Sequence, residues 1–154
     1  MEIRPAVETE AGLLSALAMS AKAHWGYSVE VLEAWRSELA LSPEDVQMKL
    51  TFVVVVDEEI AGFYSLAPSK ASWALDNLWV LPQFMNRGVG RTLLSHALET
   101  ATLHGAAEVT VDADPNAALF YIECGAIYRG EVSAPIPGQP ERVRPQLAFC
   151  GHAT

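Results

Sequence analysis

The chain passes from a strand into a helix within the stretch Val80-Leu-Pro-Gln-Phe-Met-Asn-Arg-Gly-Val-Gly-Arg-Thr-Leu-Leu94. The extended segment 73–81 ends at Pro82, and apolar residues then recur at helical spacing from Val89 to Ala101. A second β-branched segment follows at 108–112. Because a strand, a helix and a strand in this order form a crossover between parallel strands, the stretch predicts an α/β fold.

The rest of the chain adds antiparallel strands and further helices. Extended runs predict strands at 2–4, 52–56, 60–66, 126–132 and 143–149. Helices are expected around Leu13, Leu14 and Leu17, after the caps Ser28 and Ser42, and from Pro115 to Cys124. We predict a single domain over residues 1–154, with a mixed, mostly antiparallel sheet of six to seven strands flanked by about four helices.

Composition excludes several classes of partner. The chain has 154 residues and a net charge of -9, which would repel a nucleic acid backbone. An acidic surface favours a cationic substrate, although it is also an ordinary route to solubility. The absence of a long apolar run and of a leader-like start predicts a cytoplasmic protein without a membrane partner. Its histidines and cysteines show no metal-binding spacing, so we expect no metal.

A glycine-rich loop precedes the central helix. Gly88 and Gly90 flank one residue there, and a helix start offers unpaired N–H groups and partial positive charge to an anion such as pyrophosphate. Arg87 and Arg91 would add positive charge. The alternative is ordinary turn chemistry. The loop lacks the Lys-Ser/Thr pair of a nucleoside-triphosphate loop and the third glycine of a dinucleotide-binding loop.

This loop, the segment 78–82, Asn116 and the pair Phe120-Tyr121 together resemble the GNAT superfamily of acyl-CoA-dependent N-acyltransferases. The loop pattern of that family, Q/R-x-x-G-x-G/A, falls on 85–90 with Met85 in place of the first polar residue. The second pattern, N-x-x-A-x-x-F-Y-x-x-x-G, is matched in part, because Leu119 occupies the usual small position.

The resemblance implies a GNAT-like fold, acetyl-CoA as the acyl donor and a set of site residues. Asn116 would contact the pantetheine arm and Tyr121 would be the general acid that protonates the departing sulfur. The Val80 N–H would stabilise the oxyanion. The implied cofactor-binding residues are Trp79, Val80, Leu81, Arg87, Gly88, Val89, Gly90, Arg91, Thr92, Asn116 and Phe120.

The general base and the acceptor site are less defined. Asp76 precedes Val80 by four residues, so both side chains share one face of a regular strand unless a bulge intervenes. The resemblance places His24, Trp25 and Tyr27 where the first two helices shape the acceptor pocket. Each of these residues also suits a purely structural role, and a water relay would need no dedicated base.

These observations predict an N-acetyltransferase that moves an acetyl group onto a primary amine of a small molecule or protein, by direct attack in a ternary complex. The alternative hypothesis is a non-catalytic acyl-CoA-binding or sensing module. A homodimer formed through the closing strands is a further hypothesis.

Overall fold

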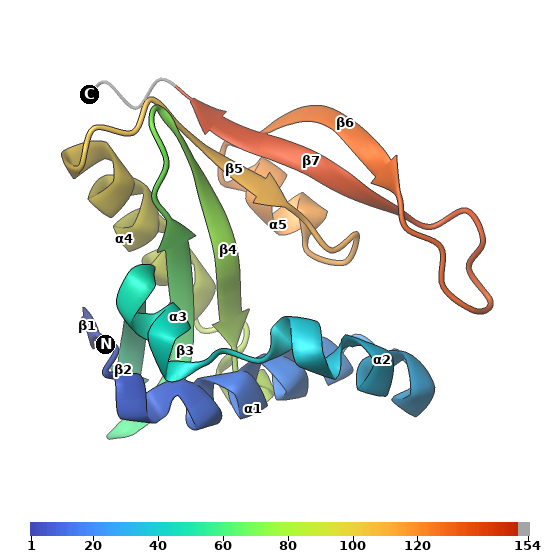
Figure 1. The fold of residues 1–154 in the computed structure, drawn as a ribbon, viewed down its shortest axis with the longest axis horizontal. Helices are drawn as coiled ribbons and strands as arrows, with labels where there is room; N and C mark the ends of the chain where they lie inside the picture. The colour runs from blue at the N-terminus through green and yellow to red at the C-terminus, as the bar shows by residue number, and fades with distance from the viewer. Residues whose placement is uncertain (151–154) are drawn as a thin grey trace.

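The computed structural model describes residues 1–150, which form a seven-stranded sheet in the order β1-β2-β3-β4-β5-β7-β6 (Figure 1). All neighbouring strands are antiparallel except β4 and β5. The predicted mixed, mostly antiparallel sheet is therefore confirmed. The strands are β1 (Glu2–Pro5), β2 (Leu50–Val56), β3 (Glu59–Ala67), β4 (Ser72–Val80), β5 (Glu108–Asp112), β6 (Ile127–Ser133) and β7 (Val143–Cys150).

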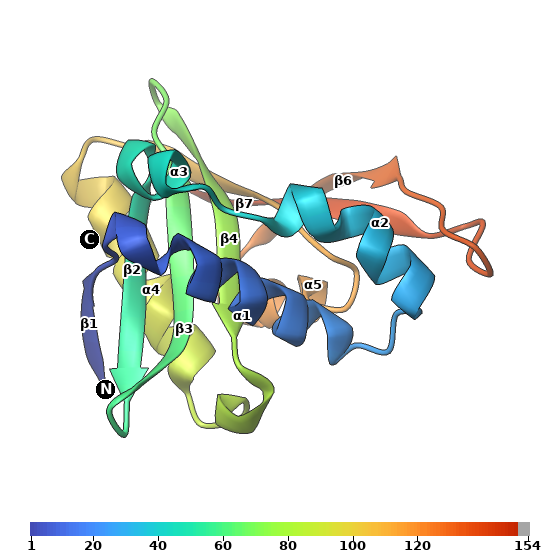
Figure 2. The ribbon, with the colours of Figure 1, turned by 60° about the horizontal axis from the view of Figure 1, so that its bottom comes forward.

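Helices cover both faces of the sheet. Figure 2 shows α1, α2 and α3 in front of the strands and α4 and α5 behind them. One apolar core lies between α1 and the β2–β3 hairpin, and a larger one lies beneath α4 and α5. The helices are α1 (Ala11–Ala23), α2 (Val29–Leu39), α3 (Pro43–Met48), α4 (Val89–Leu103) and α5 (Ala118–Glu123), with short 3-10 turns η1 (Glu8–Glu10) and η2 (Pro82–Phe84).

Helix starts follow the capping residues where these are strong. The Ser28 side chain accepts a hydrogen bond from the Val31 N–H and begins α2. Ser42 and Asp45 form a reciprocal capping box at the start of α3. Both predicted helix starts are confirmed. Each cap favours a helix start because it satisfies N–H groups that the helix itself leaves unpaired.

The parallel strands β4 and β5 pair over only a short distance. Ser72, Trp73 and Ala74 pair with Glu108, Val109 and Thr110, and the strands separate beyond these pairs (Figure 1). The second half of β4 therefore keeps its β3 partner on one edge and faces an opening on the other. This opening positions the site described below.

Strand β3 approaches β4 closely at Gly62. Gly62 pairs with Val80, and a Cβ atom at Gly62 would lie 2.6 Å from the Trp79 carbonyl oxygen and 3.1 Å from Leu93 Cδ1. Only glycine fits this contact without a backbone shift. Trp79 and Val80 are thereby held at one position along the opening.

Strand β6 forms one edge of the sheet and exposes Ile127, Tyr128 and Val132. The homodimer through the closing strands stays a prediction, and this edge would form it. No helix in the part of the chain that the structure describes is long and apolar enough to cross a membrane.

Candidate active site

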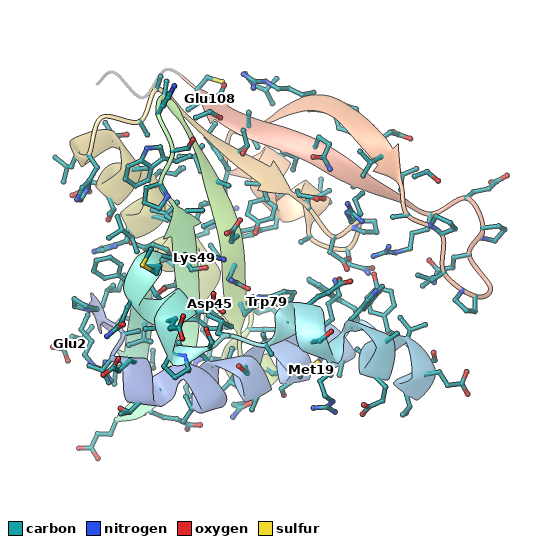
Figure 3. All side chains as sticks on the ribbon, viewed as in Figure 1. Glu2, Met19, Asp45, Lys49, Trp79 and Glu108 are labelled. Atoms are coloured by element: carbon teal, nitrogen blue, oxygen red, sulfur yellow. The ribbon has the colours of Figure 1, made fainter. Side chains whose placement is uncertain are left out.

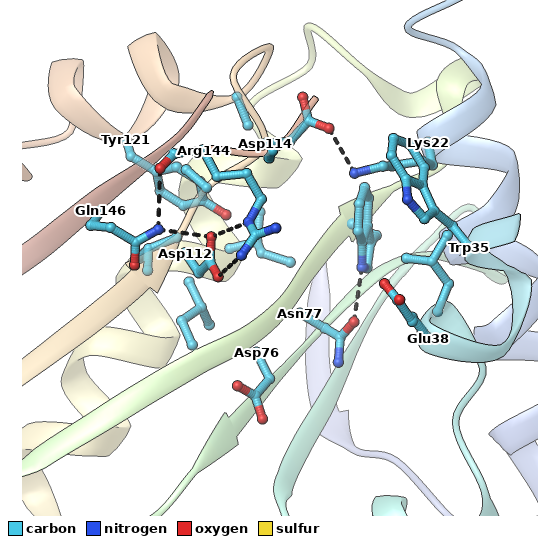
Figure 4. A pocket seen from close by; sticks show the side chains of 18 of the residues that line it. Lys22, Trp35, Glu38, Asp76, Asn77, Asp112, Asp114, Tyr121, Arg144 and Gln146 are labelled. Carbon is cyan, nitrogen blue, oxygen red and sulfur yellow. Dashed lines mark hydrogen bonds and ion pairs between the residues drawn. The ribbon is translucent and has the colours of Figure 1, made fainter. Parts of the chain in front are cut away.

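Two cavities meet at the opening between β4 and β5. The larger has a volume of about 700 Å³ and lies between α2, β4, β5 and β7 (Figure 4). The smaller has a volume of about 370 Å³ and adjoins the start of α4. Residues that line both cavities are Trp25, Leu78, Trp79, Ala117 and Tyr121. Molecules in the two cavities would therefore meet at these five residues.

The start of α4 presents unpaired N–H groups to the smaller cavity. Gly88 adopts a left-handed conformation with φ of 81°, and Asn86 does so with φ of 61°. Within residues 1–150, the N–H groups of residues 87–91 donate to no other backbone or side-chain group. Thr92 differs from the prediction, because its N–H donates to the Gly88 carbonyl at 3.1 Å. The arrangement suits an anion at a helix start.

Side chains around this helix start divide into those that face the cavity and those that do not. Gly90 and Arg91 line it, and a Cβ atom at Gly90 would lie 3.4 Å from the Phe120 ring. Val89 is buried in the core, so only its backbone is available. The Arg87 guanidinium instead lies 3.6 Å from Asp57 and over the Phe84 ring. Arg87 lines neither cavity, and the predicted anion contact of its backbone N–H stays a prediction.

The backbone of β4 directs the Val80 N–H into the opening. The Leu81 N–H donates to the Ala61 carbonyl at 2.8 Å, and the Trp79 carbonyl faces Gly62, so both groups point toward β3. Because successive residues of a strand point their N–H groups to opposite edges, the Val80 N–H faces β5. Val80 lines the smaller cavity, whereas Leu81 does not.

Tyr121 lies on α5 at the meeting point of the two cavities. Its side chain is buried, with 6% exposure, yet its hydroxyl forms no hydrogen bond with another residue of the segment 1–150. Burial raises the pKa of the Tyr121 phenol well above its usual range. The hydroxyl therefore stays protonated at neutral pH and can act as a proton donor.

Asp76 lies in a bulge of β4. Leu75 and Asn77 pair with successive residues of β3, which leaves Asp76 as the extra residue between them. The bulge breaks the alternation that would place Asp76 on the same face as Val80. The Asp76 carboxylate lines the larger cavity and lies 2.9 Å from the Lys49 ammonium.

The three residues predicted for the acceptor site do not lie together around one cavity. The Trp25 ring packs on Trp79 at 5.9 Å between centroids, and Figure 3 shows Trp79 near the end of β4, beside α2. Tyr27 packs against Trp35 at 4.8 Å. His24 is exposed and lines neither cavity.

Charged side chains of the larger cavity are arranged mostly as pairs. Figure 4 shows Lys22 with Asp114 at one end and Arg144 with Asp112 at the other. Burial alone would raise the pKa of the Asp114 carboxyl, but the hydrogen bond and charge of Lys22, together with hydrogen bonds from the Asn116 N–H and the Tyr27 hydroxyl, lower that pKa. No three histidine, cysteine, aspartate or glutamate side chains within residues 1–150 come together in a way that could hold a metal ion.

A protein-family model for the GNAT acetyltransferase domain matches residues 48–125, which are 78 of the 154 residues. The chain belongs to the GNAT acetyltransferase family. It is accordingly an N-acetyltransferase with acetyl-CoA as the acyl donor. No curated protein matches its sequence.

Solved GNAT structures share this fold over nearly the whole chain. A GCN5-related N-acetyltransferase from Rhodopseudomonas palustris is 25% identical, with a TM-score of 0.79 over 97% of this chain and 95% of the other. PaiA N-acetyltransferase from Thermoplasma acidophilum, in complex with coenzyme A, is 19% identical, with a TM-score of 0.78 over 97% and 98%. The ribosomal-protein-S18-alanine N-acetyltransferase of Escherichia coli is 17% identical, with a TM-score of 0.72 over 99% and 97%.

Four residues of this GNAT site were missing from the sequence-based prediction: Lys22, Trp35, Asp114 and Arg142. The helix expected from Pro115 instead begins at Ala118. Residues 115–117 form a turn, in which the Asp114 carboxylate accepts from the Asn116 N–H and the Ala117 N–H donates to the Asp114 carbonyl. A signal was present, since Asp114 lies two residues before Asn116 and Lys22 lies three residues before the aromatic segment 25–27.

Proposed function

We propose that this GNAT enzyme transfers an acetyl group from acetyl-CoA in the smaller cavity to a primary amine in the larger cavity, within a ternary complex. The observation that carries the proposal is the meeting of the two cavities at Tyr121, beside the unpaired edge of β4. Donor and acceptor would reach the same point from opposite sides. Direct attack then needs no covalent intermediate with the protein.

The smaller cavity has the groups that acetyl-CoA requires. Unpaired N–H groups of residues 87–91 and the Arg91 side chain suit the pyrophosphate. Gly90 leaves space beside Phe120 that a larger side chain would fill. When bound, acetyl-CoA supplies the thioester whose carbon–sulfur bond breaks as the amide bond forms.

Two groups of the protein would assist the transfer. The Val80 N–H, which faces the opening, would donate to the carbonyl oxygen as negative charge develops on it. The Tyr121 hydroxyl would give its proton to the departing sulfur. The Asp76 carboxylate is paired with Lys49, so we assign removal of the amine proton to water in the larger cavity, with Asp76 as part of its acidic wall.

One lining carboxylate and the net charge of the chain favour a cationic amine as the acceptor. Glu38 lines the larger cavity without an ion pair among the described residues, whereas Asp76 and Asp112 are paired with Lys49 and Arg144, and the whole chain carries a net charge of -9. Such a field attracts a protonated amine toward the opening before it loses its proton.

Thiol release tests the proposed function. Purified protein is mixed with acetyl-CoA and, separately, with a diamine, an amino acid, a peptide N-terminus and a lysine-containing peptide. We expect thiol release that requires both acetyl-CoA and one of these amines. Binding of acetyl-CoA without release for any amine would instead support the non-catalytic acyl-CoA-binding module.

A negative charge placed in the smaller cavity tests whether acetyl-CoA binds there, and the same charge placed on an exposed face of α4 is the matched control. Gly90→Glu should abolish acetyl-CoA binding, because its side chain would meet Phe120 and repel the pyrophosphate. Ser95→Glu adds the same charge to the exposed face of α4 and should bind normally. Equal binding by both variants would contradict the assignment of the smaller cavity to acetyl-CoA.

We also propose that the reaction takes place in the cytoplasm. Cys124 and Cys150 are both free thiols, which suits a reducing compartment. Fractionation of the native cells with detection of the protein would test this location.

A further inference from the structure

A buried cluster around Asp114 connects the larger cavity with the smaller one. The Asp114 carboxylate is 5% exposed, and its Oδ2 accepts from Lys22 Nζ at 2.6 Å and from the Tyr27 hydroxyl at 2.8 Å. The Arg142 guanidinium, 4% exposed, lies 3.4 Å from the same oxygen and donates to the Tyr27 hydroxyl oxygen at 3.0 Å. These residues come from α1, the turn after α1, the end of β5 and the loop before β7.

Aromatic rings enclose the cationic side of this cluster. The Lys22 ammonium lies 4.6 Å from the Trp35 ring centroid and 5.7 Å from that of Trp79. The Arg142 guanidinium lies 5.2 Å from the Trp35 centroid. Rings and cations at these distances attract each other, which helps to fix both cations beside Asp114. The carboxylate is thereby held ionised and in one orientation.

The other carboxylate oxygen, Asp114 Oδ1, holds Asn116. It accepts from the Asn116 backbone N–H at 2.8 Å and from Asn116 Nδ2 at 2.9 Å. Asn116 Nδ2 also donates to the Tyr27 hydroxyl oxygen at 3.1 Å. An amide nitrogen has two hydrogens, so both are used. The amide oxygen of Asn116 is the remaining polar group of this side chain, and the residue lines the smaller cavity.

We infer that Asp114 is a positioning residue, which orients the Asn116 amide so that its oxygen accepts a hydrogen bond from an amide N–H of the pantetheine arm. The inference rests on the proposed assignment of acetyl-CoA to the smaller cavity. Without the carboxylate, the Asn116 amide could rotate and present its NH₂ group, which repels the same N–H donor. Tyr27 supports this orientation by accepting the second amide hydrogen.

A double-mutant cycle on coenzyme A binding tests this role. The dissociation constant for coenzyme A is measured by calorimetry for the wild type, Asp114→Asn, Asn116→Ala and the double variant. Each single variant should bind about tenfold more weakly, as expected for one lost hydrogen bond. The double variant should bind no more weakly than Asn116→Ala alone, because Asp114 acts through the side chain that is already absent.

The matched control is Asp112→Asn. Asp112 lines the larger cavity two residues earlier and binds Arg144 and Gln146. Asp112→Asn should leave the dissociation constant for coenzyme A unchanged. A general effect of removing a carboxylate from this region would weaken binding in both variants and would overturn the inference.

Two outcomes overturn the positioning role directly: wild-type affinity of Asp114→Asn, or a double variant about a hundredfold weaker than the wild type. If Asp114→Asn does not fold, Tyr27→Phe replaces it in the cycle, because it removes the second acceptor of the Asn116 amide and retains the carboxylate. A wild type that binds coenzyme A but releases no thiol contradicts the proposed catalysis and leaves this cycle valid. A wild type that does not bind coenzyme A overturns both proposals.

Discussion

Tyr121 combines three properties at a single residue. It lies on α5 where the two cavities meet, it is buried, and burial raises the pKa of its phenol. A group that stays protonated at neutral pH can donate its proton to a departing thiolate. These properties make the Tyr121 hydroxyl the side-chain group on which the proposed chemistry depends most.

Tyr121→Phe should reduce kcat by about 100-fold or more, the usual contribution of a general acid, with little change in coenzyme A affinity. The ring is retained, so packing against Phe120 and Phe149 should persist. Steady-state thiol release and calorimetry measure the two effects. Tyr128→Phe, at an exposed position of β6, should leave both values unchanged. An unaltered kcat in Tyr121→Phe would remove the acid role.

The sequence identified residues whose roles depend on local backbone, and it missed those that depend on distant contacts. Gly88 and Gly90 were predicted at a helix start, where the structure places them. Asp114 and Lys22 are separated by 92 positions, and no local pattern announces their ion pair. The resemblance predicted His24 at the acceptor pocket, whereas in the structure it is exposed and lines neither cavity.

At the scale of elements, the contact of β3 with β4 leaves the least space for a side chain. Gly62→Ala would place a methyl group 2.6 Å from the Trp79 carbonyl oxygen, so the strands must shift apart. We expect a loss of about 1–3 kcal/mol in the free energy of unfolding, as for other overpacked sites. Because Trp79 and Val80 line the smaller cavity, coenzyme A affinity should fall as well.

Gly12 provides the opposite case for the same substitution. It lies in α1, and a Cβ atom there would meet nothing within 4 Å. Gly12→Ala should therefore raise the free energy of unfolding by about 0.5–1 kcal/mol, since alanine favours the helix. Denaturant titrations compare the two variants. A stable Gly62→Ala protein with normal affinity would show that the contact is not required.

Elements with strong local signals were predicted well, and their irregularities were not. The capped helices α2 and α3 and the β2–β3 hairpin occur where expected. The bulge at Asp76 depends on the pairing of β4 with β3, which the residues of β4 alone do not encode. The helix after Asp114 starts three residues later than expected, because residues 115–117 form a turn first.

At the scale of the whole molecule, paired carboxylates should make stability sensitive to acid. Ion pairs and hydrogen bonds lower the pKa values of Glu10 and Asp112, and Lys22 lowers that of Asp114 despite its burial. In the unfolded chain these groups have pKa values of about 4. The unfolded state then binds more protons than the native state as the pH falls below about 5, so the free energy of unfolding decreases.

Urea titrations from pH 6 to pH 3 should therefore show a steady loss of stability. The double variant Lys22→Met with Asp114→Asn lacks one of these pairs, and its stability should fall less over the same range. The comparison uses the slope against pH, because the variant also changes the absolute stability. An identical slope in both proteins would show that Asp114 does not contribute.

The overall type of sheet could be predicted from the sequence, but the separation of β4 from β5 could not. The order of periodicities predicts a parallel crossover inside an antiparallel sheet, as observed. Both strands continue past their last pair without any residue that marks a break in pairing. Beyond these pairs β4 keeps only β3 as its partner, while β5 pairs with β7 throughout residues 108–112, so the divergence shows only in the pairing of the complete sheet.

The two cavities are built from different parts of the chain, and this has a consequence for engineering. The smaller cavity draws nearly all of its lining from residues 78–121, inside the segment that matches the family model. The larger one takes much of its wall from residues 22–39 and 134–146, outside that segment. Exchange of these two outer segments between relatives should therefore change which amine the enzyme accepts, while the cavity proposed for acetyl-CoA stays the same.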